Sequence, residues 1–209
     1  MIRILIVDDH AILRRGLKEI LEREFRDVGI GEAGTAEHAL TQLDAGNWDL
    51  VILDITMPGR SGVDVLRNLK ALRPKLPVLV LSMHPEDQYG KRVLKAGASG
   101  YMNKESAPEE LIKAVRKLLS GGRYVSPTLA ETLAVDLGRD DETPAHERLS
   151  DREFEVLRKM ASGKTVGQIA QELHLSVPTV STYRARILEK MGMSTNADLI
   201  RYAVSHHLV

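Results

Sequence analysis

The stretch from Leu50 to Pro58 places a charged residue at the end of a run that is otherwise apolar. Leu50 to Leu53 are consecutive, mostly branched apolar residues, a pattern typical of a strand buried on both faces of a parallel sheet. The run ends at Asp54, and Pro58 and Gly59 then break the chain before the next helical pattern. Because ligands bind at the carboxyl ends of strands in open α/β sheets, Asp54 is a candidate site residue.

Polar residues also follow the other apolar runs of the first 120 residues. One carboxylate pair follows the first run, a hydroxyl ends the fourth, and an amine comes shortly after the fifth. In chain order, the residues at these strand ends are Asp8, Asp9, Asp54, Ser82 and Lys104. Since the carboxyl ends of parallel strands meet at one edge of a sheet, we expect these side chains to lie together.

Strands and helices alternate through residues 1–120. The apolar runs cover residues 2–7, 28–33, 50–54, 77–82 and 100–102. Each is followed by apolar residues at helical spacing, with Thr35 as a candidate N-cap and Ser106 to Glu109 in the pattern of a capping box. Five such units predict an α/β domain with a five-stranded, doubly wound parallel sheet.

The pattern changes after residue 120. Residues 121–146 contain leucines spaced for one short helix and then a Gly-, Pro- and acid-rich stretch, so we expect a linker there. Residues 147–209 contain four short helical patterns and no strand, beginning with a capping box at Ser150 to Glu153. A tight turn between the second and third of these helices predicts a small, all-α helix-turn-helix domain.

Composition excludes several classes of protein. The chain is 43% hydrophobic and 28% charged, as in ordinary soluble proteins, and it has no apolar tract that could span a bilayer, so we expect a cytoplasmic protein with no membrane contact. The absence of cysteine excludes disulfides and thiolate catalysis. Because the formal net charge is zero, any nucleic-acid-binding face must come from the local placement of basic residues.

Acidic side chains at adjacent strand ends repel one another unless a cation lies between them. Mg²⁺ suits a site that offers a few carboxylates together with water and phosphate oxygens. An Asp carboxylate in such a site can attack phosphorus to form an acyl phosphate, with a lysine neutralising the phosphoryl oxygens and a hydroxyl donating a hydrogen bond. Residues 1–120 contain each of these parts.

At this point the chain resembles the receiver domain of bacterial response regulators, a flavodoxin-like fold. By this resemblance, Asp54 accepts a phosphoryl group from a sensor histidine kinase, and Lys104 pairs with that group. The resemblance also implies that Mg²⁺ is held by Asp9, Asp54 and the Thr56 carbonyl, and by Asp8 through water. Ser82 and Tyr101 resemble the switch pair of the family, in which movement of the hydroxyl lets the aromatic ring rotate.

The third helical pattern of the second domain has the two faces that a recognition helix needs. At 100° per residue, Val180, Tyr183, Ile187 and Met191 share a buried side. The candidate DNA contacts, at the start, on the outer face or at its margins, are Thr179, Ser181, Thr182, Arg184, Ala185, Arg186 and Lys190. Lys190 and Arg184 would reach phosphates, whereas Thr182 and Arg186 would approach base edges.

Residues 148–209 resemble the LuxR-like helix-turn-helix domain of NarL/FixJ-type response regulators. Leu149 to Glu153, Thr179-Val180 and Lys190 to Gly192 match the motif. The chain departs from it at Ser181 and Ala185, where many members have basic residues. The two resemblances imply a transcription regulator that is switched by phosphorylation and binds double-stranded DNA as a homodimer, through an interface that the sequence leaves open.

Two other functions remain as alternatives. An enzyme that turns over phosphate esters through an aspartyl phosphate at Asp54 would need a second acid two residues later as general acid, and Thr56 occupies that position. We therefore expect a protein that is not a turnover enzyme. The other alternative keeps the fold but makes the first domain a protein-interaction switch that does not depend on phosphate.

Overall fold

The computed structural model describes residues 1–57, 62–83, 86–137 and 144–209, and it divides the chain into two compact units, Met1–Arg139 and Asp140–Val209. The first unit contains β1 (Ile2–Val7), α1 (Ala11–Glu24), β2 (Val28–Ala33), α2 (Ala36–Ala45), β3 (Leu50–Asp54), α3 (Gly62–Leu72), β4 (Val78–Ser82), α4 (Glu86–Lys95), β5 (Gly100–Asn103), α5 (Pro108–Leu119) and α6 (Pro127–Leu137). Pro58 and Gly59, which we expected to break the chain, lie outside the described residues.

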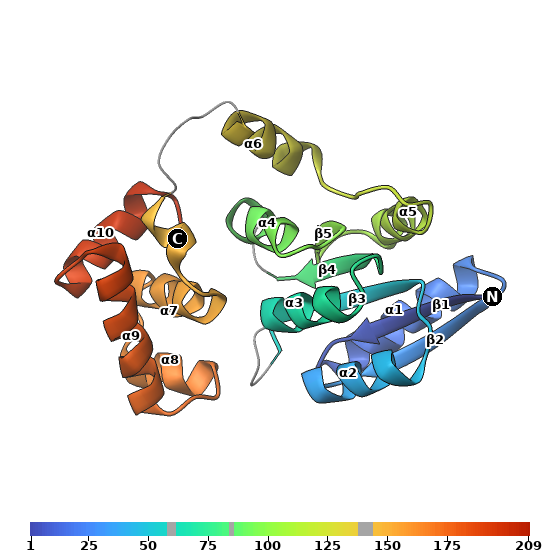
Figure 1. Cartoon of the computed structure of the whole chain (residues 1–209), viewed down its shortest axis with the longest axis horizontal. Helices are drawn as coiled ribbons and strands as arrows, with labels where there is room; N and C mark the ends of the chain where they lie inside the picture. The colour runs from blue at the N-terminus through green and yellow to red at the C-terminus, as the bar shows by residue number, and fades with distance from the viewer. Residues whose placement is uncertain (58–61, 84–85, 138–143) are drawn as a thin grey trace. The chain divides into compact units, whose positions relative to one another are not determined.

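The five strands form one parallel sheet in the order β2-β1-β3-β4-β5, which confirms the predicted doubly wound fold (Figure 1). Side chains alternate between its two faces. Ile6, Ile52 and Leu79 pack in one buried cluster with residues of α1 and α5, while the residues between them, such as Leu53 and Val80, are buried on the face covered by α2, α3 and α4. The strands are therefore buried on both faces, as continuous apolar runs require.

Helix starts were predicted correctly at Thr35 and incorrectly at Ser106. The Thr35 hydroxyl accepts a hydrogen bond from the His38 amide and caps α2. In contrast, the N-cap of α5 is Ala107, without a side-chain bond, and proline occupies its first turn. The reason is that the Ser106 amide donates to the Asn103 carbonyl, which holds Ser106 in the turn after β5.

The first unit extends beyond residue 120, where we expected it to end. The predicted linker helix exists as α6, but it packs against α4 and has Leu129 buried at 1% exposure. Figure 1 shows α6 beside α4. The expected division into residues 1–120, 121–146 and 147–209 therefore differs from the compact units, because a helix in the predicted linker has a packing partner in the sheet domain.

The second unit is all-helical. It contains a short 3₁₀ helix (Ala145–Arg148), α7 (Asp151–Ala161), α8 (Val166–Glu172), α9 (Val177–Met191) and α10 (Asn196–Ser205). The predicted capping box at Ser150 and Glu153 is present, since each side chain binds the backbone amide of the other. The short turn after α8 leads to Ser176, the N-cap of α9. This arrangement confirms the predicted helix-turn-helix.

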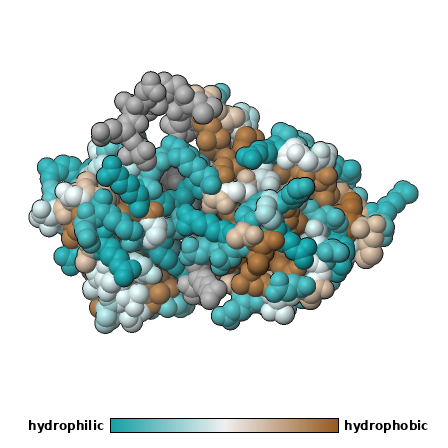
Figure 2. Space-filling model, viewed as in Figure 1, coloured by the Kyte–Doolittle hydropathy of each residue, from teal (hydrophilic) through white to brown (hydrophobic). Residues whose placement is uncertain are grey.

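Hydrophobic residues are exposed in several places on the first unit. Figure 2 shows them on the visible face, interspersed with hydrophilic residues. Ile12 is 90% exposed, and Leu72 and Met83 are each 57% exposed. In the described parts of the chain, no helix combines the length and apolar character needed to cross a membrane.

Candidate functional site

The carboxylates of Asp8, Asp9 and Asp54 meet at the carboxyl edge of the sheet. The strands β1 and β3 are parallel neighbours, and Val7 pairs with Leu53, so the next residues, Asp8 and Asp54, reach the edge together. Each of the three carboxylates offers an oxygen that lies within 4.8 Å of the others. Asp8 and Asp54 are buried, which concentrates negative charge where water screens it least.

Lys104 lies between two of these carboxylates. Its Nζ atom is 2.7 Å from Oδ2 of Asp8 and 2.7 Å from Oδ2 of Asp54. The Lys104 amide donates to the Ser82 carbonyl over 2.9 Å, which ties the loop after β5 to the end of β4. One ammonium group therefore neutralises part of the charge of two buried acids, as the arrangement of strand ends predicted.

The charges at this site shift one another's protonation. Burial raises the pKa of the Asp54 carboxyl, while the Lys104 ammonium and the Thr56 amide, which donates to Oδ1 over 2.9 Å, oppose that rise. Burial alone would lower the pKa of Lys104, but its bonds to Asp54 and Asp8 outweigh burial and raise it. Lys104 is therefore held as an ammonium beside a carboxylate that burial makes costly to keep charged.

The residues present fit a hard cation. Their ligand atoms are carboxylate oxygens, which Mg²⁺ prefers, and an Oδ1 atom of Asp9 is buried without a hydrogen-bond donor. The imidazole of His10 joins the same cluster, since its Nδ1 atom lies 3.0 Å from Asp8 and 3.1 Å from Asp9. Sequence reasoning missed His10, although its position directly after the acidic pair was a signal.

The expected switch residues Ser82 and Tyr101 are both buried, at 0% and 1% exposure. Ser82 ends β4, beside Asn103 of β5. Tyr101 alternates with Met102, which packs on the side of α1 and α5, so its ring points to the side of α4. Thr56 is exposed, and its amide rather than its side chain contacts Asp54.

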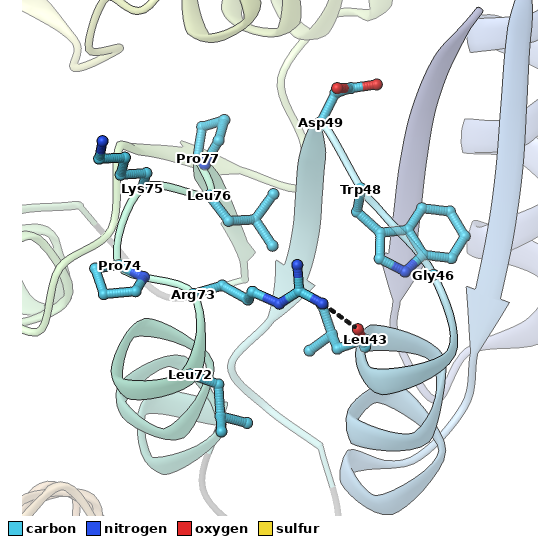
Figure 3. Close-up of a pocket in the computed structure, with 10 residues that line it drawn as sticks. All are labelled: Leu43, Gly46, Trp48, Asp49, Leu72, Arg73, Pro74, Lys75, Leu76 and Pro77. Atoms are coloured by element: carbon cyan, nitrogen blue, oxygen red, sulfur yellow. Dashed lines mark hydrogen bonds between the residues drawn. The ribbon is translucent and has the colours of Figure 1, made fainter.

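A second cavity lies at the opposite edge of the sheet, between α2 and α3 (Figure 3). It is lined by Trp48, Pro74 and neighbouring residues at the amino ends of β3 and β4. Arg73 crosses it and donates to the Leu43 carbonyl over 3.3 Å, near the end of α2. This cavity is therefore far along the strands from Asp54 and takes no part in the acidic site.

Helix α9 presents a small polar face outward. Val180, Ile187 and Met191 are buried, as their spacing predicted. The exposed residues on the other side are Ser181, Thr182, Ala185, Arg186 and Glu189. The Thr182 hydroxyl donates to the Pro178 carbonyl over 3.0 Å, and the Thr179 and Ser176 hydroxyls are 2.7 Å apart. The outer face thus has short side chains, which let a helix approach base edges closely.

Two of the expected phosphate-contacting residues have partners inside the domain. The Nζ atom of Lys190 lies 2.7 Å from Oε2 of Glu153, whose side chain is 3% exposed. Burial alone would raise the pKa of the Glu153 carboxyl, but Lys190 and Ser150 lower it. Arg184 donates from Nε to Oδ1 of Asn196 over 2.9 Å. Both residues therefore also fix the ends of α9 against neighbouring helices.

Comparison with known proteins accounts for both units. Residues 4–116 match the response regulator receiver domain, and residues 147–203 match the bacterial regulatory proteins of the luxR family. The response regulator UvrY of Escherichia coli K12 is 32% identical over 209 residues, covering all of this chain and 96% of UvrY. The response regulator GacA of Pseudomonas aeruginosa is 34% identical over 210 residues, covering all of this chain and 98% of GacA.

Solved structures show the same combination of domains. RcsB of Salmonella enterica serovar Typhimurium, bound to the promoter rprA in the presence of the phosphomimetic BeF₃⁻, is 29% identical with a TM-score of 0.65. The match covers 96% of this chain and 97% of that one. The response regulator ChrA of a heme-sensing two-component system is 29% identical with a TM-score of 0.51, and the match covers all of this chain and 98% of that one.

Proposed function

The chain belongs to the NarL/FixJ-type response regulators, transcription regulators that join a receiver domain to a DNA-binding LuxR-type domain, and we propose that phosphorylation of Asp54 by a sensor histidine kinase switches it. The observation that carries this proposal is the Asp54 carboxylate at the strand edge, with Lys104 at 2.7 Å and two further acids beside it. An oxygen of Asp54 attacks the phosphorus of a phosphohistidine, the P–N bond breaks, and an acyl phosphate forms on Asp54.

The residues around Asp54 divide the work of this transfer. Lys104 releases Asp54 and pairs with the incoming phosphoryl oxygens, and the Ser82 hydroxyl donates to them. Asp8, Asp9, Asp54 and the Thr56 carbonyl hold Mg²⁺, which supplies positive charge opposite those oxygens when it is bound. Movement of Ser82 toward the phosphoryl group is then transmitted to the Tyr101 ring on the side of α4.

An apolar groove beside the site supports a protein as the phosphoryl donor. It has a volume of about 680 Å³ and runs from Lys104 between α1 and the loop before α5. Ile12 and Met83 line it and are largely exposed. Exposed apolar patches of this kind mark interaction surfaces, so we assign the groove to the histidine-bearing domain of the kinase.

We further propose that the protein receives and loses its own phosphoryl group without turning over other phosphate esters. A turnover phosphatase needs a general acid for the leaving group. At the position two residues after Asp54, Thr56 has no titratable side chain, and it contacts Asp54 through its amide. This supports a switch that acts on DNA in the cytoplasm.

The experiment that tests the proposal is DNase footprinting with and without a small-molecule phosphodonor such as acetyl phosphate, with phosphoryl uptake followed in parallel. Phosphorylation is expected to lower the protein concentration needed for protection about 5- to 150-fold, the usual range of coupling between two sites. The solved dimers of RcsB on DNA support a homodimer as the binding species, so protection should depend steeply on protein concentration. Equal protection with and without phosphoryl uptake would contradict phosphorylation control.

A second prediction separates base reading from helix positioning on α9. Arg186 is exposed, and the described residues offer it no ion-pair partner, so Arg186→Ala should cost about 1–3 kcal/mol of DNA binding and alter base preference. Thr182→Ala should have a similar, position-specific effect. Lys190→Ala should instead lower the free energy of unfolding by about 1–2 kcal/mol, because it leaves the buried Glu153 carboxylate without its cation.

Binding-site selection, salt titration and thermal unfolding of the three variants distinguish these roles. The sequence alone predicts that Lys190 contacts a phosphate. In that case Lys190→Ala would leave stability unchanged and reduce the salt slope by about one per subunit at specific and nonspecific sites alike. Altered base preference in Lys190→Ala, with none in Thr182→Ala, would show that the outward face of α9 has been misassigned.

A further inference from the structure

The segment after α5 returns along the outer edge of β5 and extends the sheet. Tyr124 pairs with Gly100 in a parallel bridge. Its amide donates to the Ser99 carbonyl over 3.0 Å, and its carbonyl accepts from the Tyr101 amide over 3.1 Å. The outer edge of β5, which would otherwise offer unpaired backbone groups, is therefore occupied by the chain that leads to the DNA-binding domain.

Two glycines make room for this segment. A Cβ atom at Gly100 would lie 2.8 Å from the Tyr124 carbonyl oxygen, so the close approach of the two backbones requires glycine there. A Cβ atom at Gly90 of α4 would lie 2.7 Å from Cδ2 of Leu129. Leu129 is 1% exposed. Both contact points of the segment are thus built into the receiver surface.

Polar contacts hold the same segment at its start. The Tyr124 hydroxyl donates to Oε2 of Glu110 in α5 over 2.6 Å. Burial and Glu110 raise the pKa of Tyr124 to about 12, so this hydroxyl keeps its proton. The Ser126 hydroxyl accepts from the Leu129 amide over 3.1 Å and caps α6. The Ser126 amide lies 3.4 Å from Oε1 of Glu86 in α4.

The strand that holds the segment also reaches the phosphorylation site. Tyr101 binds Tyr124 through its backbone, and β5 leads directly to Lys104, whose ammonium contacts Asp54. A phosphoryl group on Asp54 would draw on the Lys104 ammonium and the Ser82 hydroxyl, both at the ends of β4 and β5. The side chain of Tyr101 and the docked segment then respond to the same displacement of β5 and α4.

We propose that residues 123–137 are the output element of the receiver, docked on β5 and α4 through Tyr124 and Leu129 while Asp54 is unphosphorylated, and released in part when Asp54 is phosphorylated. The inference rests on the proposed function. It is a coupling between two states of one element, so the docked segment and the phosphoryl group oppose each other reciprocally. Release frees the chain that leads to the DNA-binding domain.

Disulfide trapping tests this directly, because the chain has no cysteine of its own. The double variant Gly90→Cys with Leu129→Cys places two thiols at the contact between α4 and α6. In mild oxidant, the unphosphorylated protein should cross-link rapidly. Phosphorylation should slow cross-linking about fivefold or more. In the control, Asp54→Asn in the same double variant, the phosphodonor should leave the rate unchanged.

Amide hydrogen exchange of the unsubstituted protein gives a second measurement that does not depend on how the double variant folds. The amides of Tyr101, Tyr124 and Leu129 should lose protection on phosphorylation by a similar factor. Unchanged cross-linking and unchanged protection in protein that has demonstrably taken up phosphate would overturn the inference while leaving the proposed function intact. Absence of phosphoryl uptake would contradict the proposed function and the inference with it.

Discussion

Replacing Asp54 with asparagine is expected to abolish phosphoryl uptake and, with it, the phosphorylation-dependent gain in DNA binding. Asparagine fills nearly the same volume, but its amide cannot form an acyl phosphate. The fold should persist, because the substitution removes a charge that burial disfavours and Asp8 still pairs with Lys104. We expect the free energy of unfolding to change by less than about 1 kcal/mol.

The measurement is phosphate incorporation from a phosphodonor, with thermal unfolding recorded on the same samples. Asp64→Asn is the matched control, since Asp64 is a half-exposed carboxylate on α3, paired with Arg67 and outside the acidic site. It should take up phosphate at the rate of the unsubstituted protein. Incorporation in Asp54→Asn at an undiminished level would place the acceptor on another residue.

Gly62→Ala should strongly destabilise the receiver. The added Cβ atom would lie 2.3 Å from the Ile55 Cα atom and 2.6 Å from the Asp54 carbonyl oxygen, and both are backbone atoms that cannot rotate away. The start of α3 would have to move away from the end of β3. Overpacking of this kind costs about 1–3 kcal/mol or more, and the displacement would also disturb the Asp54 side chain.

Gly16→Ala is the control for Gly62→Ala. Gly16 lies within α1, and an added Cβ atom there meets nothing within 4 Å. Because alanine is favoured over glycine in a helix, Gly16→Ala should stabilise the protein by about 0.5–1 kcal/mol. Urea unfolding of the two variants measures both effects. A Gly62→Ala protein as stable as the parent would show that α3 and β3 separate more easily than the structure indicates.

Much of the receiver and its site was predictable from sequence, because local patterns sufficed. The continuous apolar runs predicted the strands that bury Ile52 and Leu79. Parallel strands end at one edge, so a polar residue after each run predicted the cluster of Asp8, Asp54 and Lys104. Other contacts had no local signal. The ion pair between Lys190 and Glu153 joins residues far apart in the chain.

The sequence by itself determined the parallel sheet, the helix-turn-helix and the acidic edge, since each depends on periodicity or on residue type at a strand or helix end. Only the tertiary structure decided that α6 belongs to the receiver and that Tyr124 extends its sheet. A leucine-spaced helix has the same pattern whether it packs or spans a linker. Its partner is selected by the space above Gly90 and Gly100, which exists only once α4 and β5 have packed.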